Sequence, residues 1–411
     1  MSTATSPDRS TTLPRGGAST GRLIGLDLAR GIAVIGMFTV HAPPAAGLLE
    51  VFHGRAAVLF AVLAGVSLSL IDDPQRPSAR TPARARIAIR AVVLFVLGLA
   101  LTSIHAPFMV ILQSYGVLFL LSLPVLRLRA TALAALAAAW AVAGPLMSFA
   151  IRSHMPTPRV LGYVPGFGDV TSWHGIGFAL QSVLLTGAYP VLTWVPFVLT
   201  GMALGKLDLR AVRGHLVGFG AVLALAGYGI SWMAMHIFGG FDRVLALLPG
   251  IPPSLVPLVL GSDLGTVPTT DPVYLLTSTP HSGTTFEIVG STGVAVAVLG
   301  ACLFAERFRR ALAPLAAVGA LPLTSYVGQC FLLQAFASPA LKTTVAGQPV
   351  VRWLLLVTAA VVFTAVWRRF LGRGPLERGL HRLSCVPTRR MPSGSGRKRG
   401  QAPLPDRQES P

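Results

Sequence analysis

The segment Gly21–His41, GRLIGLDLARGIAVIGMFTVH, has the length and apolar composition of a helix that crosses a bilayer. Two opposite charges, Asp27 and Arg30, interrupt it three residues apart, which places both on one helix face. A charge within lipid costs about 3 kcal/mol or more, so such residues face a protein interior or a wet cavity and usually pair. The segment predicts a transmembrane helix with a buried polar face. The alternative is that Asp27 and Arg30 pair near the cytoplasmic end and only fix helix packing.

The rest of the chain repeats this apolar pattern. Of its 411 residues, 53% are hydrophobic and 12% are charged, about half the charged fraction of a typical soluble domain. Continuous apolar runs of about 20 residues recur, which indicates helices rather than the alternating strands of a membrane barrel. We predict an all-α, polytopic transmembrane helix bundle of about ten spans. The spans are expected at about 23–41, 56–71, 88–104, 108–126, 130–150, 188–205, 215–237, 286–304, 315–337 and 352–371.

The formal net charge of +19 is distributed unevenly. Most of the 34 Lys and Arg residues lie before the first span, in alternate connections and after the last span. Positive charge marks the cytoplasmic side of a membrane protein, so both termini are predicted to be cytoplasmic, with the chain in the plasma or inner membrane. The expected partner of this charge is the anionic head-group layer at the cytoplasmic face, and its placement argues against nucleic acid.

The two ends of the chain differ in composition from its centre. Residues 1–20 are predicted to form a disordered N-terminal segment, 21–371 the transmembrane domain, and 372–411 a basic disordered cytoplasmic tail. The first apolar run is expected to be retained, because no Ala-x-Ala cleavage signal ends it. Cys302, Cys330 and Cys385 have neither metal-ligand nor disulfide spacing, so no metal site is predicted.

Polar residues cluster near the predicted outer ends of the spans. His41 closes the first span, and the stretch VFHGR, Val51–Arg55, opens the second after a short hairpin. His41 and His53 are therefore expected to lie close together, where a neutral imidazole accepts a proton from a hydroxyl or amine nucleophile. Arg55 would hold an anionic group in bidentate fashion. The alternative is that both histidines are interfacial residues solvated at the head groups.

A second polar cluster, TPHSGTTFE over Thr279–Glu287, opens the eighth span. A pair between His281 and Glu287 would orient the imidazole for general-base catalysis. The alternative is a helix N-cap, in which Thr284 caps the first turn and Glu287 interacts with the positive helix end. This second interpretation does not account for His281.

The ninth span carries polar residues among apolar ones. Tyr326 and Gln329 are three residues apart and share a helix face. They either line a cavity or hold neighbouring helices together by hydrogen bonds.

Three stretches resemble known families. LDLARGIAVIGM, Leu26–Met37, is similar to the opening helix of bacterial membrane proteins related to the catalytic domain of heparan-alpha-glucosaminide N-acetyltransferase, matching a Leu-Asp-x-x-Arg-Gly core. Phe52–Gly65 and Leu321–Gln329 are more similar to the related YeiB-like family of unknown function. The acetyltransferase resemblance implies transfer of an acetyl group from acetyl-coenzyme A across the membrane to a sugar amine or hydroxyl. It further implies a histidine after the first span as base or acyl carrier, for which His41 is the nearest match and His53 the alternative.

Taken together, these features predict a membrane acyltransferase with acyl-coenzyme A as co-substrate, no bound cofactor, and a sugar or envelope acceptor. The alternatives are a small-molecule transporter and a non-catalytic membrane protein. Histidines gathered around one outward cavity would favour the enzyme, and a continuous polar path would favour transport. Catalytic roles are assigned to His41, His53 and His281, and substrate-binding roles to Asp27, Arg30, Arg55, Glu287, Tyr326 and Gln329.

Overall fold

The computed structural model describes residues 23–72, 82–156, 162–262, 264–338 and 348–385. Over these residues the regular structure is helical, and one isolated bridge pairs Gly162 with Gly187. The helices are α1 Ile24–His41, α2 Ala46–Phe52, α3 Arg55–Ile71, α4 Ala83–Ser103, α5 Leu112–Ser122, α6 Ala130–Ser153, α7 Trp173–Gln181, α8 Val191–Leu204, α9 Arg213–His236, α10 Gly240–Leu247, α11 Val256–Leu260, α12 Thr285–Ala305, α13 Ala313–Ala320, α14 Pro322–Phe336, α16 Pro349–Leu371 and α17 Pro375–Ser384. Short 3-10 or π segments lie at Phe167–Val170, Ser182–Thr186, Pro253–Leu255, Pro272–Leu276 and Glu306–Phe308.

The structure confirms an all-α, multi-pass membrane protein. Within the described residues, seven helical segments are long and apolar enough to cross a membrane, and α13 with α14 makes an eighth if this pair, bent by 86°, is one span. A helix overlaps each of the ten predicted spans, but α5 and α8 are short and the ninth span is broken between α13 and α14. The 11 residues of α5 cover only about 17 Å at the rise of an α-helix, less than the hydrocarbon core. The count of ten and the cytoplasmic placement of the termini stay predictions.

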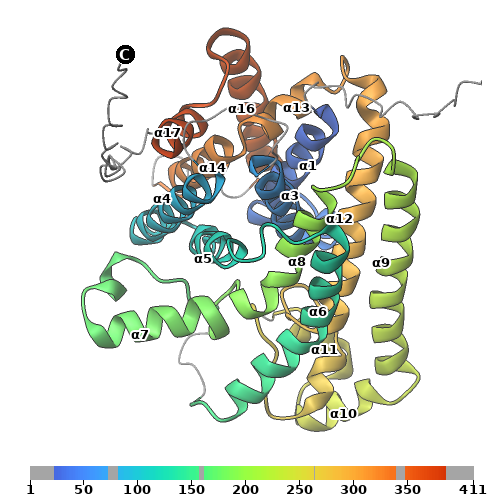
Figure 1. The fold of residues 1–411 in the computed structure, drawn as a ribbon. Helices are drawn as coiled ribbons and strands as arrows, with labels where there is room; N and C mark the ends of the chain where they lie inside the picture. The colour runs from blue at the N-terminus through green and yellow to red at the C-terminus, as the bar shows by residue number, and fades with distance from the viewer. Residues whose placement is uncertain (1–22, 73–81, 157–161, 263, 339–347, 386–411) are drawn as a thin grey trace, which may run out of the picture.

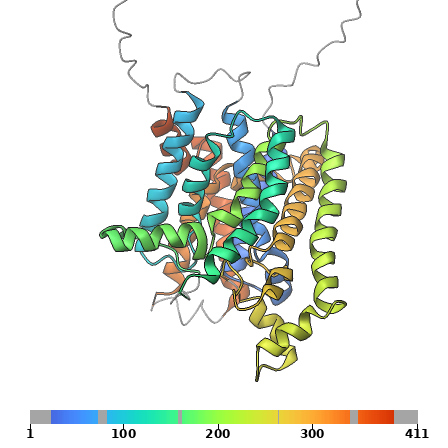
Figure 2. The ribbon, with the colours of Figure 1, turned by 60° about the horizontal axis from the view of Figure 1, so that its bottom comes forward.

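The helix α1 lies at the centre of the bundle, in contact with α3, α12, α13, α14 and α16 (Figure 1). Its spanning window is 67% buried, against 22% for α9 and 17% for α16. These fractions place α1 inside and α9 and α16 at the periphery, where large nonpolar side chains such as Leu225 and Phe370 face outward. In lipid such exposure is the expected state of a spanning helix. Figure 2 shows the long helices running roughly in one direction, with α7 projecting sideways from the bundle.

The first and last described residues lie at the same end of the bundle, here called the terminal end. The opposite end, here called the distal end, carries α7, α10 and α11. The α10 helix is fastened there by an ion pair in which the Nη2 atom of Arg243 donates to Asp271 at 2.7 Å. The hydrogen bond from Arg243 lowers the pKa of the Asp271 carboxyl below its usual range. This pair links α10 to the start of the 3-10 segment Pro272–Leu276 within the long distal connection between α9 and α12.

Sequence composition predicted disorder for the whole of 372–411, and this is wrong for its first part. Pro375–Ser384 forms the helix α17, which packs against α4 and α14 at the terminal end. Its nonpolar residues recur on one helix face, and the Arg, Pro and Ser content of the tail masked this short pattern. Residues 386–411, like 1–22, lie outside the described residues.

The helices α3 and α8 cross at two glycines. A Cβ atom on Gly201 would lie 1.9 Å from the carbonyl oxygen of Val62, and one on Gly65 would lie 2.2 Å from the carbonyl oxygen of Val198. Both contacts are with backbone, which has no rotamer to change. Small residues are what lets helices of membrane proteins approach this closely.

Gly201→Val is therefore expected to force α3 and α8 apart and to lower the free energy of unfolding by about 3 kcal/mol. The measurement is thermal unfolding of the purified protein in detergent. Gly218→Val on α9 is the matched control, because a Cβ atom there meets no atom within 4 Å. Equal unfolding midpoints for the two variants would contradict close packing at this crossing.

Candidate functional site

The polar face of the α1 helix carries the Asp27–Arg30 pair near its start and His41 at its end. Near its start, Asp27 is buried and its Oδ1 accepts a hydrogen bond from Nη1 of Arg30 at 3.4 Å. The Nη2 atom of Arg30 donates to the hydroxyl of Ser67 on α3 at 2.7 Å. The predicted pairing of Asp27 with Arg30 is therefore present, and it ties α1 to α3 near the terminal end.

His41 is the last residue of α1 and lies against α14. Its Nδ1 atom lies 2.6 Å from Nε2 of Gln329. Its ring stacks on Phe108, with centroids 4.2 Å apart and an interplanar angle of 7°. The structure thus joins two residues predicted from distant spans, and it fixes the imidazole both by a hydrogen bond and by a stacked ring.

The amide orientation of Gln329 sets the tautomer of His41. As placed, the amide donates to Nδ1 of His41, and Oε1 of Gln329 is buried with no hydrogen-bond partner among the described residues. A half-turn of the amide lets Oε1 accept a hydrogen bond from the Nδ1–H of His41. Nε2 of His41 is then the free proton acceptor, which is the form a general base requires.

His53 and His281 form a second imidazole pair. Their ring centroids are 5.3 Å apart, and His281 also contacts the rings of Tyr189 and Trp194. Gly54, with a φ of +71°, turns the chain between α2 and α3, and a Cβ atom there would lie 3.1 Å from Cβ of Pro280. This turn places His53 against the loop that carries His281.

Three cavities follow one another from the terminal end to the distal end. The inner cavity, about 200 Å³, is lined by Arg30, Ser67, Arg90, Tyr115 and Leu380 among others. The central cavity, about 30 Å³, is lined by residues that include His41, Gly54, Tyr189 and His281. Met37, Ile111 and Tyr326 line both the inner and the central cavity, so these two spaces are neighbours. A third, outer cavity is lined by Arg55, Tyr228 and Trp232 among others.

Tyr326 lies at the boundary between the inner and central cavities. Its ring meets Phe108 edge-on at 5.4 Å, and its hydroxyl accepts a hydrogen bond from the backbone N–H of Ile111 at 3.4 Å. Among the residues that the structure describes, no acceptor takes the O–H hydrogen of Tyr326, which can therefore reach a group in the cavity. Tyr326 lines both cavities, whereas Gln329 of α14 hydrogen-bonds His41 of α1. The position of Tyr326 therefore fits the cavity interpretation, and that of Gln329 fits a hydrogen bond between neighbouring helices.

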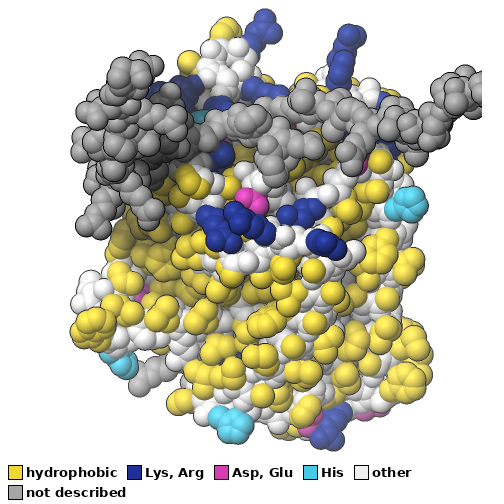
Figure 3. Space-filling view, viewed as in Figure 1, with side chains coloured by type: hydrophobic (Ala, Val, Ile, Leu, Met, Phe, Trp, Pro, Cys, Tyr) yellow, Lys and Arg dark blue, Asp and Glu magenta, His cyan; other side chains and the backbone are white. Residues whose placement is uncertain are grey.

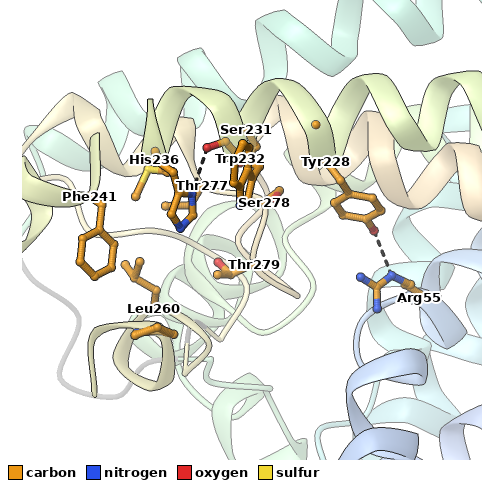
Figure 4. A pocket seen from close by; sticks show the side chains of 13 residues that line it. Arg55, Tyr228, Ser231, Trp232, His236, Phe241, Leu260, Thr277, Ser278 and Thr279 are labelled. Atoms are coloured by element: carbon orange, nitrogen blue, oxygen red, sulfur yellow. Dashed lines mark hydrogen bonds between the residues drawn. The ribbon is translucent and has the colours of Figure 1, made fainter. Parts of the chain in front are cut away.

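The outer cavity, about 580 Å³, lies at the distal end, because its wall includes Phe241 of α10 and Leu260 of α11 (Figure 4). Figure 4 shows Arg55 and Tyr228 on one side of it and Trp232, His236 and Phe241 on another. Trp232 and His236 are stacked at 5.1 Å, and Thr277, Ser278 and Thr279 form a polar edge. Arg55 and Thr279 line the outer cavity, whereas their near neighbours in the chain, Gly54 and His281, line the central cavity. The loops that carry His53 and His281 therefore lie between the two cavities.

A chain of hydrogen bonds connects Arg55 to Glu287. Nε of Arg55 donates to the Tyr228 hydroxyl at 3.1 Å, and this hydroxyl lies 2.9 Å from the hydroxyl of Ser291. Ser291 donates to Oε1 of the buried Glu287 at 3.0 Å. Nη1 of Arg55 donates to the carbonyl oxygens of Glu50 and Val51. Nε and Nη1 of Arg55 are therefore engaged by protein groups. Bidentate binding of an anion by Arg55 stays a prediction.

The predicted pair between His281 and Glu287 is replaced by a different contact. The Glu287 side chain runs along α12 to Ser291, one turn on, while its backbone N–H donates to the Thr284 hydroxyl at 3.2 Å. Thr284 is therefore the N-cap of α12, as the alternative interpretation held. His281 instead belongs to the aromatic cluster around the central cavity.

Several residues of the site were not predicted from sequence. Phe108 stacks on His41, and four residues line the cavities: Tyr189, Tyr228, Trp232 and His236. Tyr189 and Trp194 read as interfacial aromatic residues, and Tyr228 and Trp232 lie in an otherwise ordinary apolar span. Their common signal is an aromatic or hydroxyl group at a distal helix end, which many lipid-facing residues share. Among the described residues, no group of three or more His, Cys, Asp or Glu side chains is arranged to hold a metal ion.

Enclosure by the surrounding rings, together with the neighbouring imidazoles of His53 and His41, lowers the pKa of His281 to about 3. In the unfolded chain His281 titrates near pH 6.5 and binds its proton below that pH. Between about pH 3 and 6.5 the unfolded state therefore binds more protons, and this residue's contribution to stability is lost as the pH falls through that range.

His281→Phe is expected to flatten the fall in unfolding midpoint between pH 7 and 5. An unchanged slope would contradict a neutral His281.

Comparison with known families covers most of the described fold. Residues 22–236 match the family model described as heparan-alpha-glucosaminide N-acetyltransferase, catalytic. Residues 265–387 match the family described as protein of unknown function (DUF418), the YeiB-like family. No curated protein matches the chain. The first match spans α1 to α9, with His41, His53 and Arg55, and it covers more than half of the 411 residues. The chain therefore belongs to the family of heparan-alpha-glucosaminide N-acetyltransferase catalytic domains.

Proposed function

We propose that this membrane protein transfers an acyl group from a coenzyme A thioester, bound from the terminal end, to an amine or hydroxyl of an acceptor bound at the distal end. The observation that supports this most directly is the arrangement of the inner and outer cavities on either side of the histidines. A transferase that works across a membrane needs a substrate site open to each side and a reactive group between them.

The inner cavity suits the thioester end of the donor. Arg30 and Arg90 are its charged residues, and nonpolar side chains make most of its wall. Its volume of about 200 Å³ is smaller than a pocket for a whole drug-sized ligand. An acyl-pantetheine arm fits the apolar part, while the nucleotide phosphates would stay near the guanidinium groups at the mouth. Acyl-coenzyme A would be a co-substrate rather than a resident cofactor.

The central cavity would hold the reacting atoms. Nε2 of His41 would take the proton from the acceptor amine or hydroxyl as its nitrogen or oxygen bonds to the thioester carbon. The carbon–sulfur bond breaks as the tetrahedral intermediate collapses, and the imidazolium returns the proton to the departing coenzyme A thiolate. The Tyr326 hydroxyl would donate to the developing oxyanion. His53 and His281 would shape the acceptor side of this space.

The outer cavity would receive the acceptor. Its stacked Trp232 and His236 rings offer a flat nonpolar surface, and its threonine and serine edge offers hydroxyl partners. Sugars bind to this combination of ring faces and hydroxyl groups, so a sugar or envelope glycan is the acceptor we propose. The basic terminal end would then face the cytoplasm and the outer cavity the outside of a plasma or inner membrane.

The charged pair of α1 supports transfer over transport. Asp27 and Arg30 lie near the terminal end, and the residues shared by the inner and central cavities are Met37, Ile111 and Tyr326. This boundary has one hydroxyl group and otherwise nonpolar side chains, so it does not extend the charged pair into a continuous polar path.

The test is acyl transfer in sealed inside-out vesicles that contain the protein. Radiolabelled acetyl-coenzyme A is supplied outside the vesicle, at the terminal end, and glucosamine is enclosed within it. We expect label to appear on the enclosed sugar only when the protein is present. Label that remains on coenzyme A, with all nine histidines intact and with other amine and alcohol acceptors enclosed in turn, would reject the acyltransferase proposal.

A further inference from the structure

A second large hollow lies on the side of the bundle, away from the three cavities in line. It occupies about 490 Å³ between α6 and α9, with α8 and α12 as its floor, and is here called the side groove. Its wall includes Ala134 and Ala138 of α6, Pro196 of α8, Phe219 of α9 and Val296 of α12. None of the residues assigned to acyl transfer lines it.

The small side chains of α6 create the groove. Ala130, Ala134, Ala137 and Ala141 recur at helical spacing on the face that lines it. The α6 helix packs on α8, whereas α9 packs on α12, and the alanine strip leaves the space between the two pairs unfilled. Larger residues of α9, Phe219 and Leu223, form the opposite wall. The result is a slot whose length follows the helices.

The lining of the groove is suited to a hydrocarbon chain. Besides nonpolar side chains it includes only three threonines, Thr131, Thr200 and Thr292, and His215. In a bilayer, however, moving a lipid acyl chain from contact with other acyl chains into the groove gains little free energy, because both surroundings are apolar. A lipid would therefore be selected by its head group, and the end of the groove where the head group lies decides which lipid binds.

The terminal end of the groove is basic. Arg129, Lys206 and Arg213 are exposed and each is the chain neighbour of a lining residue, namely Ala130, Leu207 and Val212. Figure 3 shows Lys and Arg side chains gathered on this face above an extended nonpolar surface. The nearby acid Asp208 accepts hydrogen bonds from the backbone N–H groups of Arg210 and Ala211. Glu306 is paired with Arg210 at 3.0 Å, so both acids are engaged.

We propose that the side groove binds one acyl chain of an anionic phospholipid, with the lipid phosphate held at the basic rim by Arg129, Lys206 and the imidazole of His215. The alanine strip gives the chain its space, and the rim supplies the charge complementarity. Each rim cation contributes about a fivefold preference for an anionic over a zwitterionic head group. This site would give the expected anionic-lipid partner of the basic face a defined position.

Native mass spectrometry of the full-length protein in a non-ionic detergent tests the proposal. The probes are phosphatidylglycerol and phosphatidylcholine with identical acyl chains. We expect one phosphatidylglycerol molecule to bind at least fivefold more tightly than phosphatidylcholine. Arg129→Gln is expected to reduce this preference about fivefold. Equal affinity for the two lipids would overturn the proposal.

A matched pair of variants tests the place of binding. Ala138→Phe fills the groove, whereas Ala139→Phe adds the same ring to an exposed position of α6 that does not line it. We expect Ala138→Phe to abolish the tight lipid and Ala139→Phe to retain it, with both variants unfolding at similar temperatures. Retention of the lipid by a folded Ala138→Phe protein would show that the side groove is not its site.

Discussion

His41→Ala is expected to lower acyl transfer by about 10²–10⁴-fold, the usual contribution of a positioned general base. The imidazole is held by Gln329 at 2.6 Å and by the stacked Phe108 ring, so its loss removes a proton acceptor whose geometry is already set. The measurement is the initial rate of label transfer from acetyl-coenzyme A in membrane vesicles with equal amounts of protein. The substitution also leaves the buried Gln329 amide without its partner, so the unfolding temperature is expected to fall, and rates are compared at a temperature at which both proteins stay folded.

His174→Ala serves as the control for this result, since His174 is an exposed residue of α7. It is expected to retain the wild-type rate. Gln329→Leu tests positioning apart from catalysis, because it removes the partner of the His41 Nδ1 atom but leaves the imidazole in place. The transfer rate should fall less than in His41→Ala, and the pH profile of the rate should shift. A wild-type rate in His41→Ala, together with loss in His53→Ala, would assign the proton transfer to His53 instead.

Glu377→Ala is expected to lower the free energy of unfolding by about 2–4 kcal/mol. The break between α13 and α14 leaves backbone N–H groups at the start of α14 without partners in the helix. Glu377 of α17 accepts hydrogen bonds from the N–H groups of Leu323 at 2.8 Å and Thr324 at 3.0 Å, and from the Thr324 hydroxyl. Removal of the carboxylate leaves these donors unpaired beside the positive end of a helix. Thermal unfolding in detergent measures the change.

Arg382→Ala is the matched control, because Arg382 is an exposed residue of the same helix. Glu377→Gln should recover part of the loss, since its amide oxygen still accepts one hydrogen bond. Leu380 of α17 also lines the inner cavity. If the acyl donor binds there, Glu377→Ala should raise the KM for acetyl-coenzyme A more than it lowers kcat. An unfolding midpoint equal to that of Arg382→Ala would show that α17 does not hold the break.

These expectations depend on contacts between residues that are far apart in the chain. The partner of His41 is 288 residues away, and Tyr228 lies 173 residues from Arg55. No local pattern encodes such a pair, because its two members lie on different helices and meet only through the packing of those helices. The sequence placed His41, His53 and His281 at distal ends of spans, and the fold then brought His53 onto His281 and His41 into the same cavity as His281.

The sequence by itself determined the class of protein, the position of nearly every long helix and the family. This information is local: hydrophobicity over about 20 residues decides a spanning helix, and short motifs such as Leu26–Met37 mark the family. Only the tertiary structure decided that Glu287 bonds Ser291 rather than His281, that α17 caps a broken span, and that three cavities line up through the bundle. Those outcomes depend on helix crossings, which are set by side-chain volume on both partners at once, as at Gly65 and Gly201.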